Sequence, residues 1–254
     1  MKRKYQYNFS KTEAGKYDAL SRTRKAETMI TVLSDFIKKP LSNLSLLNVG
    51  GSGGIIDNIL ADFLHSVTSI DIDINAIQTA QKKFPKKNIS FKLGDGLKLD
   101  FKENFFDIVI CSQVYEHVTS PKQLMDEIYK VLKPGGICYF AASNRFMYNE
   151  PHYNLPLLSI VPRPIAHKYI KITGKADYYH ELHYSYWSLK KLVKNFQLFD
   201  YTEKIILNPI KYKAEYMIEP GSLKHKIASL IAKHMFWSIP GYIWILKKNN
   251  PKKG

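Results

Sequence analysis

A glycine-rich segment and an aspartate about 20 residues beyond it are the first residues in this sequence that could bind a ligand. Residues 46–54 read LLNVGGSGG, an apolar run that ends in glycines and leads into a helical pattern. Glycines let the backbone approach a ligand closely, and a helix start favours an anion. Asp71 ends the next apolar run, where a carboxylate holds ribose hydroxyls in nucleotide-binding folds. Together, the two features predict a nucleoside-containing ligand. The alternatives are a tight turn that binds nothing and an exposed acid at the end of a strand.

A nicotinamide dinucleotide fits this segment poorly, because its fingerprint G-x-G-x-x-G needs three glycines. Counted from Gly50, the second and third positions are Ser52 and Ile55. Counted from Gly51, the third position is Ile56. Neither register is complete, so the sequence disfavours a dinucleotide.

Titratable side chains follow the later apolar runs. Residues 94–96 read Gly-Asp-Gly, which offers a carboxylate to an adenine amino group, although Asp-Gly is also a strong turn signal. Glu116 and His117 follow the run 105–111, where a histidine can act as a general base. Glu150 and His152 lie in an aromatic-rich segment. There they either act on a substrate or satisfy each other within a packed loop.

A second histidine-rich stretch at 180–183 reads HELH. It lacks the H-E-x-x-H spacing that places two histidines on one helix face. The sequence therefore predicts no metal here, and we expect the aromatic residues around this stretch to form a lid or an edge of the core.

Alternating strands and helices must position these residues. We expect helices over 26–37, 55–64, 75–84 and 121–132, and strands over 44–49, 67–72, 89–93, 105–111 and 137–142. This alternation predicts a parallel sheet covered on both faces. Beyond it we expect a short helix over 160–172, a helix over 188–196, and strands over 200–207 and 242–246.

The length of 254 residues favours a single domain. We divide it into an N-terminal arm and helix (1–43), a cofactor-binding core (44–142), a substrate-side insert (143–187) and C-terminal helices and strands (188–254). The arm is expected to be loose over 1–21.

Taken in order, these motifs resemble those of the class I S-adenosylmethionine-dependent methyltransferases. The resemblance covers about residues 44–142, and the run FDIV (106–109), EHV (116–118), VLKPGG (131–136) is its most specific part. It implies a Rossmann-like, seven-stranded, mostly parallel sheet with helices on both faces and an insert after the fifth strand. The last strand pair would be antiparallel. It also implies S-adenosyl-L-methionine as the cofactor.

The resemblance assigns roles to individual residues. The glycines approach the methionyl part of the cofactor, the aspartate after the second strand holds the ribose, and the residues around the third strand end recognise the adenine. The cofactor-binding residues implied are Asn48, Gly50, Gly51, Gly54, Asp71, Ile72, Asp95, Gly96 and Gln113. The catalytic candidates are His117, Glu150 and His152.

Three positions depart from related patterns. Asn48 stands where the family usually has an acid, and Ser52 stands where a middle glycine is common. The stretch around Glu116 is similar to the E-x-x-E-H loop that is associated with a divalent metal in ubiquinone-pathway O-methyltransferases. Here Gln113 replaces the first acid, so no metal is expected.

Composition limits the partners. The formal net charge is +16 and only five of the 38 basic residues are arginine, whereas nucleic-acid sites favour arginine. This disfavours nucleic acid and is typical of a lysine-rich proteome. An amphipathic helix expected over 222–235 could contact an anionic membrane, but packing against the sheet is favoured.

Cys111 and Cys138 lie in strand-like runs and are expected to be reduced core residues. No signal peptide or membrane span is evident. The sequence thus predicts a cytoplasmic protein, with peripheral membrane contact as the alternative.

The favoured function is O-methylation of a small-molecule, glycan or lipid-linked acceptor. A nucleic-acid methyltransferase and a non-catalytic protein that kept the fold remain as alternatives.

Overall fold

The computed structural model describes residue 7 and residues 18–250. Its centre is a seven-stranded sheet with the order β3-β2-β1-β4-β5-β9-β8. The strands are β1 (Ser45–Val49), β2 (Ser66–Asp71), β3 (Ile89–Leu93), β4 (Phe106–Ser112), β5 (Leu132–Ser143), β8 (Gln197–Asp200) and β9 (Gly241–Lys247). The first five strands run parallel, and β9 is antiparallel to β5 and to β8. This confirms the predicted Rossmann-like sheet and its antiparallel strand pair.

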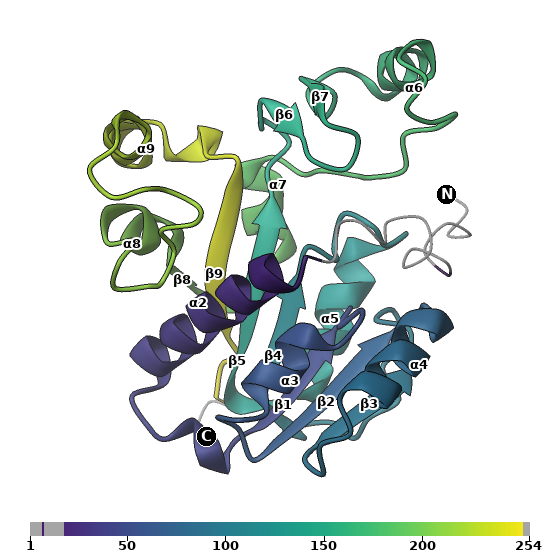
Figure 1. Ribbon diagram of the computed structural model, residues 1–254, viewed down its shortest axis with the longest axis vertical. Helices are drawn as coiled ribbons and strands as arrows, with labels where there is room; N and C mark the ends of the chain where they lie inside the picture. Colours follow the sequence, from purple (N-terminus) through teal and green to yellow (C-terminus); the bar gives the residue numbers. More distant parts are fainter. Residues whose placement is uncertain (1–6, 8–17, 251–254) are drawn as a thin grey trace.

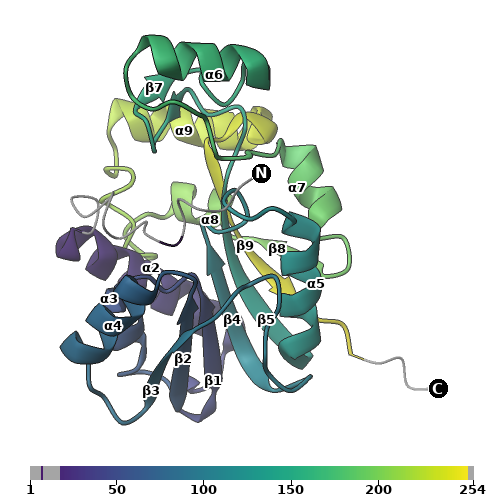
Figure 2. The same cartoon turned by 90° about the vertical axis from the view of Figure 1, so that its right-hand side faces the viewer.

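Helices cover both faces of the sheet, as predicted (Figure 1). They are α2 (Ala19–Ile37), α3 (Ile55–Leu60), α4 (Ile74–Lys83), α5 (Pro121–Val131), α6 (Arg163–Ile172), α7 (Tyr186–Leu192), α8 (Thr202–Leu207) and α9 (Leu223–His234). Figure 2 shows α2, α3 and α4 on one side of the strands and α5 and α7 on the other. Short 3-10 turns lie at η3 (Leu41–Asn43) and η4 (Phe236–Ser238).

The continuous apolar strands are explained by burial on both faces. Leu46 packs with α2 and α3, whereas its neighbour Leu47 packs with α5 and α7. In β4, Ile108 and Val109 alternate in the same way, and they pair with Leu46 and Leu47 respectively. Because successive side chains point to opposite faces, both must be apolar when helices cover both.

Local signals fix the helix starts. Ser120 caps α5 by accepting a hydrogen bond from the Gln123 N–H group, and Pro121 occupies its first turn. Asp18 caps α2 by accepting from the N–H groups of Leu20 and Ser21. Helix α2 therefore begins seven residues earlier than the predicted Ala26. The remainder of the expected N-terminal arm, 1–6 and 8–17, lies outside the described residues.

The expected strand over 200–207 is wrong over most of its length. The strand ends at Asp200, and Thr202–Leu207 form helix α8. The carboxylate of Asp200 accepts hydrogen bonds from the Thr202 N–H group at 2.7 Å and from Trp244 Nε1 at 2.6 Å. A short apolar run does not distinguish strand from helix by itself, and here the aspartate ends the strand and turns the chain.

The insert after β5 forms a small unit of its own. It contains the two-stranded pair β6 (Asn149–Glu150) and β7 (Leu155–Pro156), followed by α6. Leu155, Ala166 and Tyr179 belong to a separate apolar cluster inside this unit. The unit lies beyond the end of β5, next to the region that carries α9 (Figure 1).

Helix α9 corrects another expectation. Its apolar side chains Leu223, Ile227 and Leu230 are 73%, 50% and 62% exposed, and Ala232 is its one buried residue. These three side chains therefore do not pack against the sheet as favoured from the sequence, whereas Ile231 and Ala232 do contact the core that contains Trp244. Within 18–250, no helix is long and apolar enough to cross a membrane. Both cysteines are free and buried, as expected.

Candidate active site

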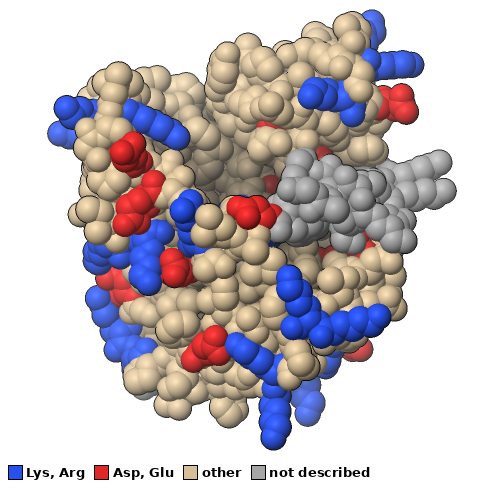
Figure 3. Space-filling model, in the orientation of Figure 1, with Lys and Arg blue, Asp and Glu red and all other residues tan. Residues whose placement is uncertain are grey.

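A cavity of about 470 Å³ opens at the carboxyl ends of the central strands. Its walls include 48–52 at the end of β1, 70–73 at the end of β2, 112–114 at the end of β4, and Ser143 at the end of β5. The strand order reverses between β1 and β4, and ligands of open α/β sheets bind at such a point. Figure 3 shows the surface hollowed between the part that carries α9 and the part that carries β6, β7 and α6.

Asp71 is held in place by backbone groups. Its two carboxylate oxygens accept hydrogen bonds from the N–H groups of Ser52 at 2.8 Å and Asp73 at 2.9 Å. Burial raises the pKa of Asp71, and these two hydrogen bonds work against that rise. The carboxylate lines the cavity, and each oxygen has lone-pair capacity left for a hydroxyl donor.

The glycine loop lets its backbone come close to a ligand, but the N–H groups of its first two glycines are already used within the protein. The N–H groups of Gly50 and Gly51 both donate to the carbonyl of Ile70, at 2.8 and 3.0 Å. A Cβ at Gly51 would lie 1.8 Å from Ser69 Oγ, so a side chain is excluded there. Ser52 has φ +55°, and its hydroxyl is buried without a hydrogen-bond partner in the described structure.

Asn48 is coupled to a buried acid that the sequence did not point to. Its Nδ2 donates to Asp57 Oδ1 at 2.7 Å, and Ser69 Oγ donates to Asp57 Oδ2 at 2.9 Å. Burial raises the pKa of Asp57 to about 6. Asn48 lines the cavity, and its side-chain Nδ2 already donates to Asp57. The side-chain carbonyl oxygen of Asn48 is therefore the atom that could accept a hydrogen bond from a ligand.

The other predicted cofactor residues divide into two groups. Ile72, Gly96 and Gln113 line the cavity, and Gln113 Oε1 accepts from Ser143 Oγ at 2.6 Å. Asp95 does not line it; its Oδ1 accepts from the Leu97 N–H group at 2.9 Å within a turn. The turn interpretation therefore explains Asp95 in this structure, and its role in adenine recognition stays a prediction. Gly54 lies behind the loop, where a Cβ would contact Ala80 and Phe91.

Helix α2 supplies three lining residues that the sequence did not suggest, namely Arg22, Lys25 and Met29. Burial and then the charge of Arg22 lower the pKa of Lys25. Met29 lies on the helix expected over 26–37, and the N-cap at Asp18 was the sequence signal that could have extended this helix to Arg22 and Lys25.

The catalytic candidates gather at the other end of the cavity. His117 and His152 both line it, with ring centroids 4.8 Å apart. His152 Nδ1 lies 2.6 Å from Oε1 of Glu150, which is fully buried. The three predicted residues are therefore brought together, although their catalytic role stays a prediction.

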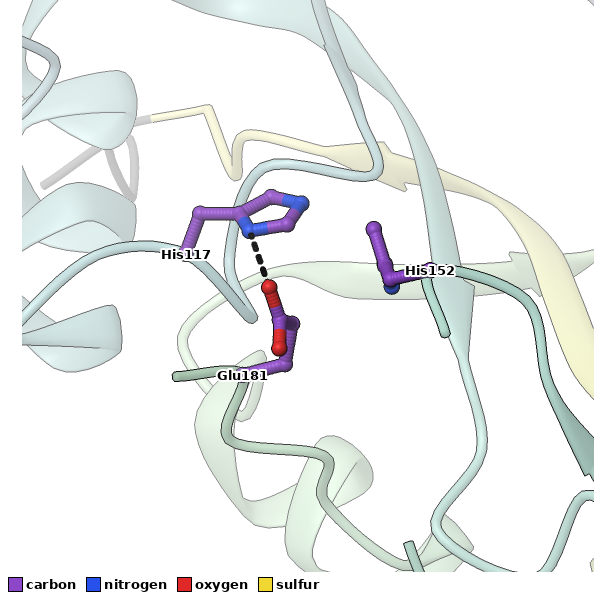
Figure 4. A group of neighbouring side chains, drawn as sticks. All are labelled: His117, His152 and Glu181. Carbon is purple, nitrogen blue, oxygen red and sulfur yellow. Dashed lines mark ion pairs between the residues drawn. The ribbon is translucent and has the colours of Figure 1, made fainter. Parts of the chain in front are cut away.

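Two residues of the 180–183 stretch join them. His183 Nε2 lies 3.2 Å from Glu150 Oε1, and His117 Nδ1 lies 3.8 Å from Glu181 Oε1. Figure 4 shows His117, His152 and Glu181 converging from different loops. The spacing along the chain gave no indication that Glu181 and His183 belong to this site.

The cluster contains strongly shifted acids. Burial raises the pKa of Glu116 to about 7, and neither of its carboxylate oxygens has a hydrogen-bond partner in the described residues. Burial opposes ionisation of Glu150 as well, but hydrogen bonds from His152 and His183 lower its pKa to about 2. Burial also opposes protonation of His152, yet the bond to Glu150 raises its pKa.

Hydrogen bonds to backbone groups hold the chain segment around Glu181 in place. The guanidinium of Arg163 in α6 donates to the carbonyls of Tyr179 and Glu181, at 2.9 and 3.1 Å. The Leu182 N–H group donates to the Glu116 carbonyl at 2.9 Å. The chain segment that carries Glu181 is thereby tied both to the insert and to the loop after β4.

The strand order and the position of the cavity are those of a Rossmann-like fold with a ligand site at its switch point. Residues 47–140 match the methyltransferase domain family. The ubiquinone biosynthesis O-methyltransferase of Actinobacillus pleuropneumoniae serotype 5b is 25% identical over 156 residues, which are 54% of this chain and 67% of that protein. The Rickettsia akari protein of the same name is 30% identical over 122 residues, covering 48% of this chain and 49% of that protein.

The fold is shared with solved methyltransferase structures. Phosphoethanolamine N-methyltransferase 1 of Haemonchus contortus, in complex with phosphoethanolamine and S-adenosylhomocysteine, has a TM-score of 0.60 and 16% identity; the match covers 100% of this chain and 51% of that one. Residues 47–140 of the chain belong to the methyltransferase domain family, and the strand order of the sheet is that of the class I S-adenosylmethionine-dependent methyltransferases. It is an enzyme that uses S-adenosylmethionine as its methyl donor.

Proposed function

We propose that this enzyme transfers the methyl group to a hydroxyl oxygen of a small-molecule acceptor. The observation that carries this proposal is the His117–His152 pair, which faces the same cavity as the ribose-holding candidate Asp71. An acceptor hydroxyl must lose its proton, and a histidine pair at that end supplies groups suited to proton transfer. The relatives named ubiquinone biosynthesis O-methyltransferases support this choice of acceptor atom.

In this proposal the cofactor lies along the strand ends. Asp71 accepts hydrogen bonds from the ribose hydroxyls, and the side-chain carbonyl oxygen of Asn48 accepts a hydrogen bond from the methionyl ammonium. Arg22 and Lys25 face the methionyl carboxylate, and Ile72 lies beside the adenine. Each of these residues lines the cavity, and each has the polarity that the facing part of the cofactor requires.

The reaction is an in-line displacement. A lone pair of the acceptor oxygen forms the new O–CH₃ bond while the S–CH₃ bond breaks, and the sulfonium sulfur keeps the bonding pair to give S-adenosylhomocysteine. The hydroxyl proton leaves toward the histidine pair. Holding oxygen, methyl carbon and sulfur collinear supplies much of the catalysis.

The first test is calorimetric titration with S-adenosylhomocysteine, comparing wild type with Asp71→Ala. We expect micromolar binding that Asp71→Ala weakens by roughly 10- to 150-fold, the value of hydrogen bonds to a charged group. Transfer of a labelled methyl group to phenols and sugar hydroxyls then identifies the acceptor class. If the folded wild type does not bind the cofactor product, or if methyl groups reach only nitrogen acceptors, the proposal fails.

The exposed face of α9 supports a lipid-linked acceptor within this class. Leu223, Ile227 and Leu230 are exposed together, and Lys224 and Lys226 are exposed on the same helix. Exposed apolar side chains beside lysines suit an anionic lipid surface. We expect sedimentation with vesicles that contain phosphatidylglycerol but not with pure phosphatidylcholine.

A matched pair of variants tests this surface. Ile227→Ser should weaken vesicle binding several-fold, whereas Phe63→Ser, which changes an exposed side chain beyond α3, should not. Equal behaviour of the two variants would remove the lipid-linked class and leave soluble acceptors.

Nucleic acid is the weaker alternative. On the face drawn in Figure 3, Lys and Arg side chains are dispersed, with Asp and Glu side chains among them. A continuous basic stripe, the feature expected of a nucleic-acid site, is not seen on that face of the described residues.

A further inference from the structure

We propose that His117, His152 and Glu181 bind a divalent transition-metal ion at the acceptor end of the cavity. The ion's role in catalysis rests on the proposed hydroxyl methylation, but its binding can be measured independently. The sequence had led us to expect no metal, because Gln113 replaces an acid of the E-x-x-E-H loop. The new site takes only His117 from that loop, and its other ligands come from two separate parts of the insert: His152 from the segment after β6 and Glu181 from the 180–183 stretch.

The separations between the three ligand atoms fit a shared ion. One nitrogen or oxygen from each of these side chains lies within 4.8 Å of the others. His117 Nδ1 and Glu181 Oε1 are 3.8 Å apart, which is too long for a hydrogen bond. Two ligands about 2.0–2.1 Å from one tetrahedral ion lie roughly 3.3–3.5 Å from each other. Small side-chain rotations therefore close the site.

Glu150 orients His152 toward that position. Its carboxylate takes Nδ1 of His152 at 2.6 Å, so Nε2 would be the ligand atom of His152 in the metal-bound form. His183 contacts the same oxygen at 3.2 Å, also a hydrogen-bond distance. Glu150 and His183 therefore act behind the ligand. Metal-binding histidines usually donate their other ring N–H group to a carboxylate, a backbone carbonyl or water, and Glu150 is such a carboxylate.

The buried charge of the cluster also calls for a cation. Glu116 and Glu150 are fully buried and Glu181 is 3% exposed. Both oxygens of Glu116 and Oε2 of Glu181 are buried without a hydrogen-bond partner among the described residues. Buried carboxylates without partners are costly, and an ion or ordered water is the usual explanation. A divalent ion bound by Glu181 would offset its charge, whereas Glu150 already has His152 and His183 as partners.

The donor set identifies the class of ion. Two imidazoles and one carboxylate suit Zn²⁺, Co²⁺ or Fe²⁺, whereas Mg²⁺ prefers oxygen ligands. Gln113 is not required, because its amide oxygen is engaged by Ser143. Three protein ligands leave a coordination position open. Since His117 and His152 line the cavity, that position faces the acceptor. With the ion bound, the two histidines would act on the hydroxyl through the ion: it would bind the hydroxyl oxygen, and the proton would pass to solvent instead of to an imidazole.

The experiment is calorimetric titration of the chelator-treated full chain with Zn²⁺ and Mg²⁺, together with the visible spectrum of the Co²⁺ form. We expect one Zn²⁺ per chain, a tetrahedral Co²⁺ spectrum and no comparable Mg²⁺ binding. His117→Ala and Glu181→Gln should each weaken Zn²⁺ by at least about 100-fold. Glu150→Gln should cost roughly 10- to 100-fold, as expected for a group behind a ligand.

His65→Ala is the matched control, because this histidine is exposed and outside the cluster; it should leave Zn²⁺ affinity unchanged. S-adenosylhomocysteine binding by every variant serves as the test of folding. Failure of wild type to bind Zn²⁺ stoichiometrically, or equal effects of His65→Ala and Glu181→Gln, would overturn the metal site. If wild type binds S-adenosylhomocysteine but not Zn²⁺, the metal proposal alone is lost. If it binds Zn²⁺ but not S-adenosylhomocysteine, the proposed methyl transfer is lost instead.

Discussion

The two ends of the cavity are built in different ways. At the cofactor end, backbone groups do most of the work: the N–H groups of Ser52 and Asp73 hold Asp71, and the Ile70 carbonyl holds the glycine loop. At the acceptor end, side chains from the loop after β4, the insert and the 180–183 stretch meet in one cluster. Several of the buried polar atoms in this cluster have no partner within the described chain.

The two ends also differ in whether their polar groups have hydrogen-bond partners when no ligand is bound. Polar groups at the cofactor end are mostly satisfied by the protein itself, so this end is preformed and should tolerate little change. The acceptor end buries carboxylates at an energetic cost, so it is organised for an ion or a substrate. Substitutions at the two ends should therefore separate cofactor binding from turnover.

The largest effect is expected at the acceptor end. His152→Ala should lower kcat by about 100- to 10,000-fold, the usual contribution of a group that assists proton transfer. S-adenosylhomocysteine affinity should stay within about threefold, since the cofactor contacts lie at the other end. Steady-state kinetics and calorimetry on the same sample check both values. A parallel loss of cofactor affinity would show that the two ends are not separable.

For Gly51→Ala, at the cofactor end, we expect the affinity for the cofactor to fall. The added methyl group would lie 1.8 Å from Ser69 Oγ and 2.9 Å from Asp57 Oδ2, so the loop must move. We expect roughly 100-fold weaker S-adenosylhomocysteine binding, equivalent to about 3 kcal/mol. Gly53→Ala is the control, because its Cβ would meet no atom within 4 Å. If calorimetry gives the two variants the same affinity for S-adenosylhomocysteine, a steric clash at Gly51 is not what controls cofactor binding.

A pH effect on stability is expected beneath the glycine loop. The pKa of Asp57 is about 6 in the folded protein against an ordinary value of 3.8. The folded state thus holds this proton more tightly, so the contribution stabilises below about pH 4 and is lost as the pH rises through 6. Relative to Asp57→Asn, wild type should lose about 2–3 kcal/mol of unfolding free energy over this window.

Urea unfolding of both proteins at several pH values between about 4 and 7 measures this difference. Asp57→Asn keeps the shape of the side chain and can still accept the hydrogen bond from Asn48. A difference that stays constant with pH would show that Asp57 does not titrate in this window.

The smallest effect is expected from Ser52→Gly. Ser52 has φ +55° and a buried hydroxyl without a partner in the described residues, and glycine removes both penalties. We expect a gain of about 0.5–1 kcal/mol in unfolding free energy, with S-adenosylhomocysteine affinity retained. Thermal unfolding gives the stability change. A loss of stability would mean that the serine hydroxyl has a role that the fold does not reveal.

Much of the fold could be predicted because its signals are local. The apolar run before Gly50, the acid at Asp71 and the Pro-Gly-Gly stop after α5 each specify a strand end or a helix end. The short run 202–207 was assigned wrongly because its apolar pattern fits either strand or helix. For α9, packing against the sheet was favoured over an exposed apolar face, and the structure shows three of its apolar side chains exposed. An amphipathic pattern does not state what covers it.

The sequence by itself determined the alternation of strands and helices, the glycine loop and the carboxylate 21 residues beyond Gly50. These features depend on neighbours along the chain and on strand ends that a parallel sheet must bring to one edge. Only the tertiary structure decided that Glu181 and His183 lie beside Glu150 and His117. The reason is that these residues are carried by loops distant in sequence, and only the packing of the insert and the Arg163 contacts set their separation.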